Sequence, residues 1–233
     1  MRPQSNGYVL KEYGSWSVLT VSYLIGLGVS RSLPWQAVPV YLALALLINS
    51  KPAYTKWLRR SGGSKTQALF LSQTGAAAII LLTVYRSGLP QLLPLILFPV
   101  AYLLLNRFAG EHFVVTELLG FTLLSLAAVL AKFLVVQGVD VRLFVAVALY
   151  FTAGVFKIKA MLLRKLQDRI LAVLYVLFAL YAYRRFQISW LILLPLAENI
   201  VSAVTLYRVR LQTTGWIEVA KSLFFLAIMI LLF

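Results

Sequence analysis

The stretch Phe151–Arg169, FTAGVFKIKAMLLRKLQDR, passes without a break from an apolar helix pattern into a cluster of cations. A helix buried in hydrocarbon cannot carry so many charged side chains, because each charge loses its hydration there. We therefore expect the chain to reach a membrane surface near Lys157. The cations of this stretch are Lys157, Lys159, Arg164, Lys165 and Arg169.

The composition agrees with a membrane protein. Of 233 residues, 61% are hydrophobic and 12% are charged, whereas a soluble domain has roughly 25% charged residues. Apolar runs of membrane-spanning length recur from end to end, and strand-period alternation is absent. The sequence predicts an all-α polytopic membrane protein, with residues 1–233 in a single membrane domain.

Nine apolar segments follow one another, and we expect each to form a transmembrane helix. The prolines Pro90, Pro94 and Pro99 should kink the fourth segment, and Pro195 should kink the eighth. The segments are Ser15–Ser30, Trp35–Ser50, Thr66–Tyr85, Leu89–Leu105, Phe113–Val135, Val141–Ile158, Ile170–Tyr183, Ile188–Leu206 and Trp216–Phe233.

The connections between these segments carry an uneven number of cations. If the N-terminus is cytoplasmic, fifteen Lys and Arg residues lie inside and six lie outside. The positive-inside rule then places the N-terminus in the cytoplasm and the C-terminus outside the cell membrane. The inner set is Arg2, Lys11, Lys51, Lys56, Arg59, Arg60, Lys65, Arg107, Lys157, Lys159, Arg164, Lys165, Arg169, Arg208 and Arg210. The outer set is Arg31, Arg86, Lys132, Arg142, Arg184 and Arg185.

A tandem duplication is one explanation of two matching offsets. Lys51 and Lys157 lie 106 positions apart, and Glu12 and Glu117 lie 105 apart. Both glutamates are followed by a glycine and an aromatic residue. The halves would be residues 11–106 and 113–207, with a ninth helix at 216–233.

The net charge of +15 is better explained by topology and anionic lipid headgroups than by nucleic acid, so we expect membrane lipids as partners and no nucleic acid. The chain has no cysteine, which excludes disulfides and thiolate metal sites. No cluster of His, Asp and Glu has the spacing of a metal site, and no cofactor is expected.

Several polar residues are candidates for a binding site. If the helix continues past Lys157, then Lys157, Arg164 and Asp168 share one face, because seven residues make almost two turns. They could form a cationic pocket for a phosphate or carboxylate, or a basic girdle on lipid phosphates. Asn49 and Lys51 lie in the other basic connection.

Carboxylates inside the apolar segments are a second kind of candidate. Glu198 falls near the middle of its segment and must face protein or water, either as a structural ion pair or as a proton-carrying or substrate-contacting acid. Glu117 and Glu218 lie nearer helix starts, where the helix dipole favours an acid without any function. Lys221 follows Glu218 by three residues, close enough for an ion pair within the helix.

Three short blocks resemble the YwiC-like integral membrane family. The opening Lys11–Trp16 is similar to its signature, K/R-E-H-G-A-W, with Tyr13 where that family usually has His and Ser15 where it usually has Ala. Glu117–Phe121 and Gly215–Ser222 resemble further blocks of the family. The matching residues in the first two blocks include Lys11, Glu12, Gly14, Trp16, Glu117 and Gly120.

That family is in turn distantly similar to the UbiA superfamily of intramembrane prenyltransferases. This resemblance implies nine helices around a central cavity, with active loops after the second and sixth helices. UbiA enzymes hold Mg²⁺ and a prenyl diphosphate with Asp-rich motifs in those loops. Here the matching stretches, Ile48–Arg60 and Tyr150–Lys165, contain no Asp or Glu, so the chain would be at most a divergent prenyltransferase-like protein.

Three functions remain open on these grounds. The first is a UbiA-like protein whose cytoplasm-facing cationic cavity binds an amphipathic anionic lipid, an isoprenoid or a phospholipid, without Mg²⁺. The others are a non-catalytic assembly or maturation factor for a membrane complex and a small transporter using Glu198. The residues expected to contact a substrate are Asn49, Lys51, Lys157, Lys159, Arg164 and Glu198.

Overall fold

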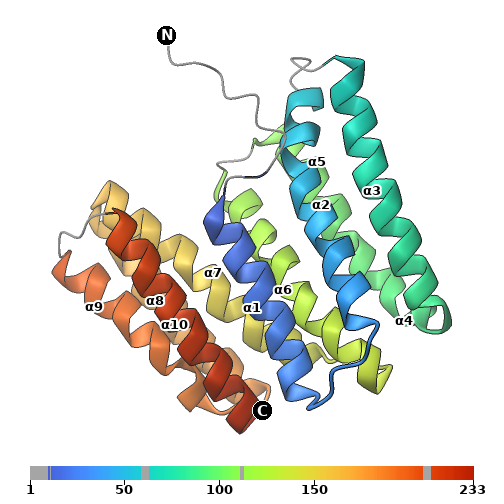
Figure 1. Cartoon of the computed structure of the whole chain (residues 1–233). Helices are drawn as coiled ribbons and strands as arrows, with labels where there is room; N and C mark the ends of the chain where they lie inside the picture. The colour runs from blue at the N-terminus through green and yellow to red at the C-terminus, as the bar shows by residue number, and fades with distance from the viewer. Residues whose placement is uncertain (1–9, 11, 59–62, 111–112, 207–210) are drawn as a thin grey trace.

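The computed structural model describes residues 10, 12–58, 63–110, 113–206 and 211–233, and these residues contain helices and turns but no strand. Successive helical passes run in opposite directions and lie side by side (Figure 1). The α-helices are α1 (Tyr13–Val29), α2 (Ala37–Leu58), α3 (Ser64–Val84), α4 (Leu89–Leu92), α5 (Leu97–Phe108), α6 (Val114–Val136), α7 (Val141–Leu163), α8 (Leu166–Arg185), α9 (Ala197–Thr205) and α10 (Leu211–Leu232). Short 3₁₀ helices, η1 (Arg86–Gly88), η2 (Leu93–Ile96) and η3 (Trp190–Leu196), complete them.

Each of the nine predicted apolar segments overlaps one helix or one run of consecutive helices of the described chain, here called a pass whether or not it crosses a membrane. The fourth pass is broken into α4, η2 and α5, with Pro90 and Pro94 in the first turns of α4 and η2. The eighth pass begins as η3, which contains Pro195, and continues as α9. The predicted interruptions are therefore present, because proline cannot donate the backbone hydrogen bond that an α-helix needs.

Six helices of the described chain are long and apolar enough to cross a membrane. The passes of α1 and of η3 with α9 are apolar but shorter. The protein is thus an all-α chain with the helix composition of a multi-pass membrane protein. The six are Ser64–Val84, Arg86–Phe108, Val114–Val136, Val141–Leu163, Leu166–Arg185 and Thr213–Leu232.

The helix α1 lies in the middle of the bundle, against α6 on one side and α10 on the other (Figure 1). Small residues permit the close approach to α6: a Cβ at Gly26 would lie 2.1 Å from Ala128 O and 2.7 Å from Ala131 Cβ. Contacts of this kind are typical of helices packed in membranes, where backbone proximity supplies the van der Waals energy. Residues of α1 belong to both of the larger buried apolar clusters in the described part of the chain.

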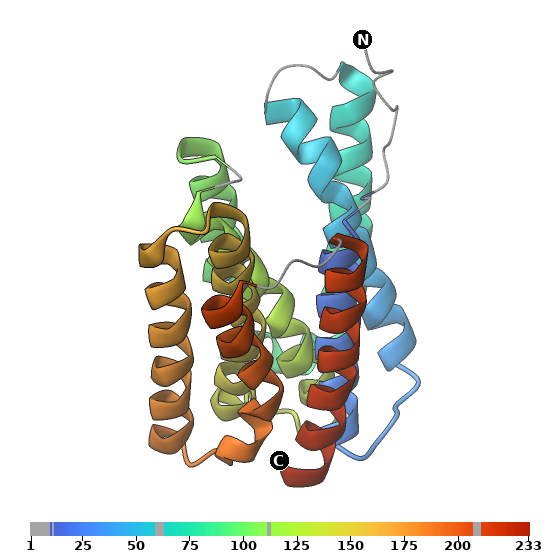
Figure 2. The same ribbon diagram turned by 90° about the vertical axis from the view of Figure 1, so that its left-hand side faces the viewer.

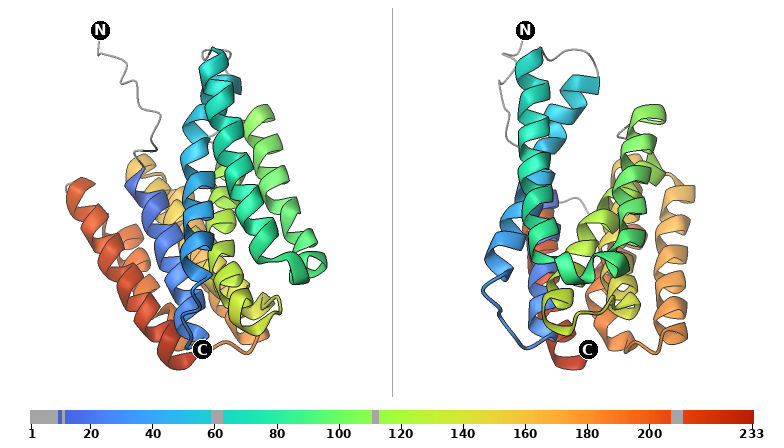
Figure 3. Two further views of the ribbon diagram at one scale, coloured as in Figure 1. Left: turned by 45° about the vertical axis from the view of Figure 1, so that its right-hand side comes forward. Right: turned by 90° about the vertical axis from the view of Figure 1, so that its right-hand side faces the viewer.

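The outermost helices bury little of their surface inside the protein. The helix α3 packs chiefly against α2 and lies at the periphery (Figure 3). Only 6% of its apolar stretch is buried inside the protein. The helix α8 forms the opposite edge (Figure 2). Its exposed side chains include Leu174 and Phe178, as expected of residues that face lipid.

The structure places Lys157 inside the protein rather than at an exposed helix end, and the position at which the chain leaves a membrane stays a prediction. The helix α7 continues for another turn and a half to Leu163, and Lys157 is 1% exposed. The predicted common face of Lys157, Arg164 and Asp168 is absent. The reason is that α7 ends at Arg164, which has a left-handed backbone (φ 54°), and Asp168 belongs to α8.

The helix α2 also differs from its predicted extent. It runs past the predicted end at Ser50, through Pro52, to Leu58. Proline removes one backbone donor, and the hydroxyl groups of Ser50 and Thr55 bond to carbonyls of the preceding turn. The basic residue Lys51 therefore lies inside a helix rather than in a connection.

Among the described residues, the alternation of the helices places predicted inner and predicted outer cations toward opposite ends of the bundle. Lys65, Lys159 and Arg164 lie at or near the end where α3 begins, and Arg86 and Arg142 lie at the other end. Of the inner set, Arg2, Lys11, Arg59, Arg60, Arg208 and Arg210 lie outside the described residues.

Candidate functional site

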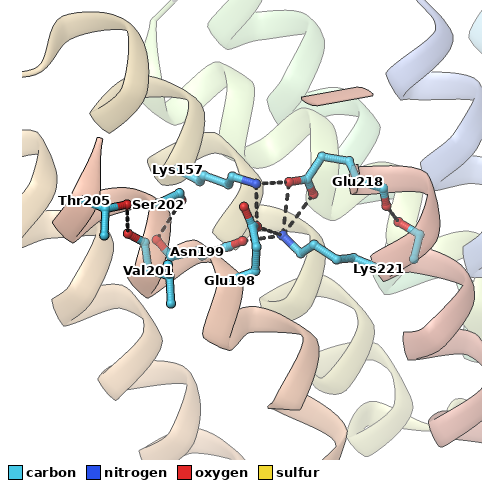
Figure 4. A network of polar contacts seen from close by, with 9 residues as sticks. Lys157, Glu198, Asn199, Val201, Ser202, Thr205, Glu218 and Lys221 are labelled. Carbon is cyan, nitrogen blue, oxygen red and sulfur yellow. Dashed lines mark hydrogen bonds and ion pairs between the residues drawn. The ribbon is translucent and has the colours of Figure 1, made fainter. Parts of the chain in front are cut away.

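Two lysines and two glutamates meet between α7, α9 and α10 (Figure 4). Lys157 Nζ donates to Glu198 Oε2 and to Glu218 Oε1, each at 2.5 Å. Lys221 Nζ donates to Glu198 Oε2 at 2.7 Å, to Glu218 Oε1 at 3.0 Å, and to the amide oxygen of Asn199. We call these five side chains the ion-pair cluster.

Local structure brings each member of the cluster to this point. Lys157 lies six residues before the end of α7, about 9 Å along the helix axis. Glu198 and Asn199 occupy the first turn of α9, where unpaired backbone N–H groups favour an acid. Glu218 and Lys221 are three residues apart on α10, and their predicted ion pair is confirmed at 3.0 Å.

The ammonium groups are more deeply buried than the carboxylates. The side chain of Lys157 is 1% exposed and that of Lys221 is 10% exposed. Glu198 and Glu218 are 25% and 35% exposed. The glutamates are thus the more accessible members of the cluster, and their carboxylates cover the Lys157 ammonium group.

The charges of the cluster balance, because two ammonium groups face two carboxylates. A buried charge without a counter-ion costs roughly several kcal/mol of stability. Removal or neutralisation of one member of the cluster therefore leaves an opposite charge unpaired and destabilises the protein. The stability of the cluster therefore depends on all four groups remaining charged.

An aromatic layer lies next to the cluster, on the side of the bundle core. Tyr150, two turns before Lys157, stacks on Phe225 of α10, with ring centroids 3.6 Å apart and planes 2° apart. Phe151 meets the Phe225 ring edge to face. These rings are almost fully buried and belong to the same apolar cluster of the protein interior.

Asn49 and Lys51, the two predicted site residues of the first basic connection, do not share a pocket with Lys157. They contact residues just before α1. Lys51 Nζ donates to both carboxylate oxygens of Glu12 at 2.9 Å. Asn49 Oδ1 accepts a hydrogen bond from the backbone N–H of Leu10 at 3.1 Å. Both contacts attach the start of α1 to α2.

The other predicted cations lie on separate sides of α7. Lys159 pairs with Glu117 of α6 at 2.9 Å, so Lys157 and Lys159 connect α7 to different neighbours. Arg164 ends α7 and is exposed. The structure thus joins Lys157 with Glu198, as two members of one site, and leaves Lys51, Lys159 and Arg164 elsewhere.

The residues of the resembling blocks have mainly local contacts. Glu12 accepts from Ser15 at 2.9 Å, and Trp16 Nε1 donates to Leu10 O at 3.1 Å. Tyr13 is 88% exposed. Gly14 has open space beside it, Gly120 lies against the Tyr102 ring, and Lys11 lies outside the described residues.

The sequence analysis did not predict that Glu218, Lys221 and Asn199 form one site with Lys157 and Glu198. Glu218 was assigned to a helix start without function, because its distance from Lys157 along the chain hides their contact. One signal was available: Glu198, Glu218 and Lys221 are the charges inside the last two apolar segments. Opposite charges in neighbouring membrane segments are expected to pair.

Comparison with known proteins gives no further assignment. No protein-family model, curated protein or solved structure matches the chain. The resemblance to the YwiC-like family and to the UbiA superfamily therefore stays a prediction.

Proposed function

We propose that the protein is a small membrane transporter that carries protons through the ion-pair cluster. The observation that carries this proposal is the contact of the buried Lys157 with two partly exposed carboxylates, Glu198 and Glu218, at 2.5 Å each. Ionisable groups inside membrane segments are costly, and proton relays in transporters use such groups.

The chemistry of one cycle begins at the exposed edge of the cluster. A proton from water adds to the carboxylate of Glu198, which becomes a neutral acid, and the net charge of the cluster rises from zero to +1. Lys157 and Lys221 then share the single carboxylate of Glu218. The arrangement loses stability because one buried ammonium lacks a counter-ion.

The element able to respond is α9, which carries Glu198. It spans nine residues and follows the 3₁₀ helix η3, which contains Pro195; its C-cap residue, Leu206, has a left-handed backbone. Interrupted helices at a charged site are common in transporters, because their ends can reorient without breaking a long helix. Loss of the Glu198 charge therefore favours movement of α9 away from α7 and α10.

The two halves of the chain support a transporter architecture built on a tandem repeat. In the first half Glu12 pairs with Lys51 of α2, and in the second half Glu117 pairs with Lys159 of α7. The fourth and eighth passes each combine a 3₁₀ segment with an α-helix. Internal repeats of this kind are frequent in secondary transporters.

Our proposal includes a topology in which all nine passes cross the cell membrane. The end of the bundle that holds Lys65, Lys159 and Arg164 faces the cytoplasm, as does the N-terminus, and the C-terminus lies outside. The unequal distribution of Lys and Arg between the two sets of connections supports this orientation.

Proton flux in liposomes tests the function. The protein is reconstituted in phosphatidylethanolamine and phosphatidylglycerol vesicles that contain a pH-sensitive dye, and an outside acid step is applied with valinomycin and potassium to compensate charge. We expect acidification faster than in protein-free vesicles, and its loss in Glu198→Gln.

The matched control is Glu117→Gln, which also removes a carboxylate paired with a lysine of α7 but leaves the ion-pair cluster intact. Its flux should equal that of the wild type. Wild-type flux no faster than in empty vesicles, or equal flux in Glu198→Gln and wild type, contradicts the proposed function.

A second candidate function is binding of an anionic isoprenoid or phospholipid at the same end of the bundle. Arg164 and Lys165 are exposed in the turn between α7 and α8, close in sequence to Lys159, and can contact a phosphate without displacing a cluster carboxylate. This candidate is the one that a UbiA-like relationship would favour. Calorimetric binding of farnesyl diphosphate in EDTA tests it: Arg164→Gln with Lys165→Gln should weaken binding, and no binding by the wild type rejects it.

A further inference from the structure

Tyr150 occupies the boundary between the ion-pair cluster and the aromatic layer. It lies two turns before Lys157 on α7, and Phe225, its stacking partner, lies two turns after Glu218 on α10. Equal offsets on two antiparallel helices place the Tyr150–Phe225 pair one layer below the Lys157–Glu218 pair. Tyr150 is 4% exposed.

The hydroxyl of Tyr150 differs from those of the other buried tyrosines. Its oxygen has no hydrogen-bond partner among the described residues. The remaining buried tyrosines each donate to a backbone carbonyl at 2.6–3.1 Å: Tyr23 to Ala37, Tyr54 to Leu103, Tyr85 to Leu130 and Tyr183 to Ala146. Buried polar groups almost always bond to protein or to ordered water.

Glu218 lies one layer above Phe225 on α10, and Glu198 binds the same ammonium group of Lys157. Both are acceptors with lone pairs beyond those used by the lysines. A water molecule needs two to four polar partners, roughly, to remain in a buried position. The phenol and the two carboxylates supply that number.

We propose that Tyr150, Glu198 and Glu218 bind a buried water molecule at the lower edge of the ion-pair cluster. Tyr150 is a positioning residue, which donates its hydrogen bond to the water oxygen and keeps its own proton. The existence of this water site is independent of transport, whereas its role as a relay rests on the proposed function.

The relay step transfers one proton between the two acids. The O–H bond of protonated Glu198 breaks as a new O–H bond forms on the water, and one of the original O–H bonds of the water breaks as its proton joins Glu218. The water is regenerated and the net charge of the cluster does not change. Tyr150 makes the transfer faster by fixing the water between the carboxylates.

Infrared difference spectroscopy of the purified protein tests the water site. We expect an O–H stretching band of a strongly hydrogen-bonded internal water, which shifts in heavy-oxygen water and disappears in Tyr150→Phe. Tyr183→Phe is the control, because the Tyr183 hydroxyl bonds to a carbonyl at 2.8 Å; it should keep the band. A wild type without such a band, or a Tyr150→Phe variant that retains it, overturns the proposal.

Stability gives a second readout that does not depend on transport. Tyr150→Phe keeps the ring stacked on Phe225, so it removes only the hydroxyl. If the hydroxyl bonds to a water, the midpoint of thermal unfolding falls; a rise overturns the proposal, because removal of an unbonded buried group stabilises a protein.

Flux separates the relay from the transporter itself. With a functional wild type, Tyr150→Phe should slow proton flux about tenfold, the effect of one hydrogen bond on a rate. Unchanged flux in Tyr150→Phe overturns the relay. Absent flux in the wild type overturns the proposed function and the relay, and the infrared band still decides the water site.

Discussion

Lys157 Nζ lies 2.5 Å from Glu218 Oε1, although 61 positions separate the two residues in the sequence. The contact joins α7 in the middle of the chain to α10 at its end. It also explains how a lysine can be buried in an apolar helix: carboxylates from two other helices neutralise it. The stability of this part of the bundle should therefore depend on Lys157.

Lys157→Met should destabilise the protein by about 3–5 kcal/mol, the usual effect of breaking a buried ion pair. The substitution leaves Glu198 and Glu218 with Lys221 as their one remaining ammonium in the cluster. Chemical denaturation of the protein in detergent measures the free energy of unfolding. The double variant with Glu218→Gln should recover part of the loss, because the charges balance again.

Lys159→Met is the control for this experiment. Lys159 pairs with Glu117 at 2.9 Å, but its side chain is 23% exposed. Exposed ion pairs contribute about 0.2–1 kcal/mol, so a small loss is expected. If Lys159→Met lowers the free energy of unfolding as much as Lys157→Met does, burial of the ion-pair cluster is not the reason for the large effect of Lys157.

Gly26→Ala should disrupt the packing of α1 on α6. The new methyl group would lie 2.1 Å from Ala128 O and 2.7 Å from Ala131 Cβ, and neither a backbone carbonyl nor a Cβ can rotate away. We expect a loss of about 1–3 kcal/mol, typical of overpacking, measured as a lower midpoint of thermal unfolding.

Gly75→Ala is the matched change in a helix with free space. No heavy atom lies within 4 Å of a Cβ at Gly75, and alanine favours a helix by about 1 kcal/mol over glycine. The unfolding midpoint should stay constant or rise. Equal losses in both variants would mean that the α1–α6 approach does not limit stability.

Much of the fold could be predicted from the sequence, because apolar runs between polar connections determine where helices form. All nine predicted segments overlap helical passes, and prolines locate the two interrupted ones. The length of α7 could not be predicted. The prediction assumed that Lys157 needs water or a headgroup, but it has Glu198 and Glu218 as partners.

The candidate site was predicted only in part for a related reason. Glu198 and Lys157 were identified one by one as chemically unusual, yet 41 positions separate them and no local pattern indicates their contact. The pair of Glu218 and Lys221 was predictable, because a spacing of three residues brings side chains together on a helix. Contacts between helices require the packing of the whole bundle.

Single-cysteine labelling can test the orientation of the bundle, since the natural sequence has no cysteine. Ser64 begins α3 and Ser87 lies in η1 at the opposite end, and both are exposed. With the N-terminus in the cytoplasm, a membrane-impermeant maleimide on intact cells should label Ser87→Cys and not Ser64→Cys. Ser64→Cys should react once the cells are permeabilised, and the reverse pattern contradicts the orientation.

Asp140 gives a pH dependence whose sign can be derived. It precedes α7 and accepts hydrogen bonds from the Leu143 N–H at 2.9 Å and from Lys132 Nζ at 2.6 Å. Burial disfavours its charged form, but these bonds outweigh burial and lower its pKa from the ordinary value of 3.8. Its stabilising effect is therefore complete above the unfolded-state pKa and is lost as the pH falls through the lower folded-state pKa.

The difference in unfolding free energy between wild type and Asp140→Asn isolates this effect. It should be constant at neutral and mildly acidic pH and should shrink below about pH 4. The other acidic residues titrate in both proteins, so their effect on the unfolding free energy cancels in this difference. A difference that grows on acidification would contradict the lowered pKa.

Arg169 of α8 should hold the end of α9 in place. Its Nε donates to Ala203 O at 2.7 Å and one terminal nitrogen donates to Val204 O at 2.8 Å. These carbonyls belong to the last turn of α9, where no further helix N–H can reach them. Because α9 carries Glu198 at its other end, Arg169 also affects the ion-pair cluster.

In Arg169→Gln, the free energy of local opening of Ala197–Thr205 should fall by about 2 kcal/mol, so that amide hydrogen exchange in this helix becomes faster. Arg169→Lys should show most of the same effect, because an ammonium cannot supply two donors in the planar geometry of a guanidinium. Arg184→Gln, which removes an exposed arginine from the far end of α8, should leave exchange in α9 unchanged. Equal exchange in α9 for Arg169→Gln and Arg184→Gln would show that α9 is held by its apolar contacts alone.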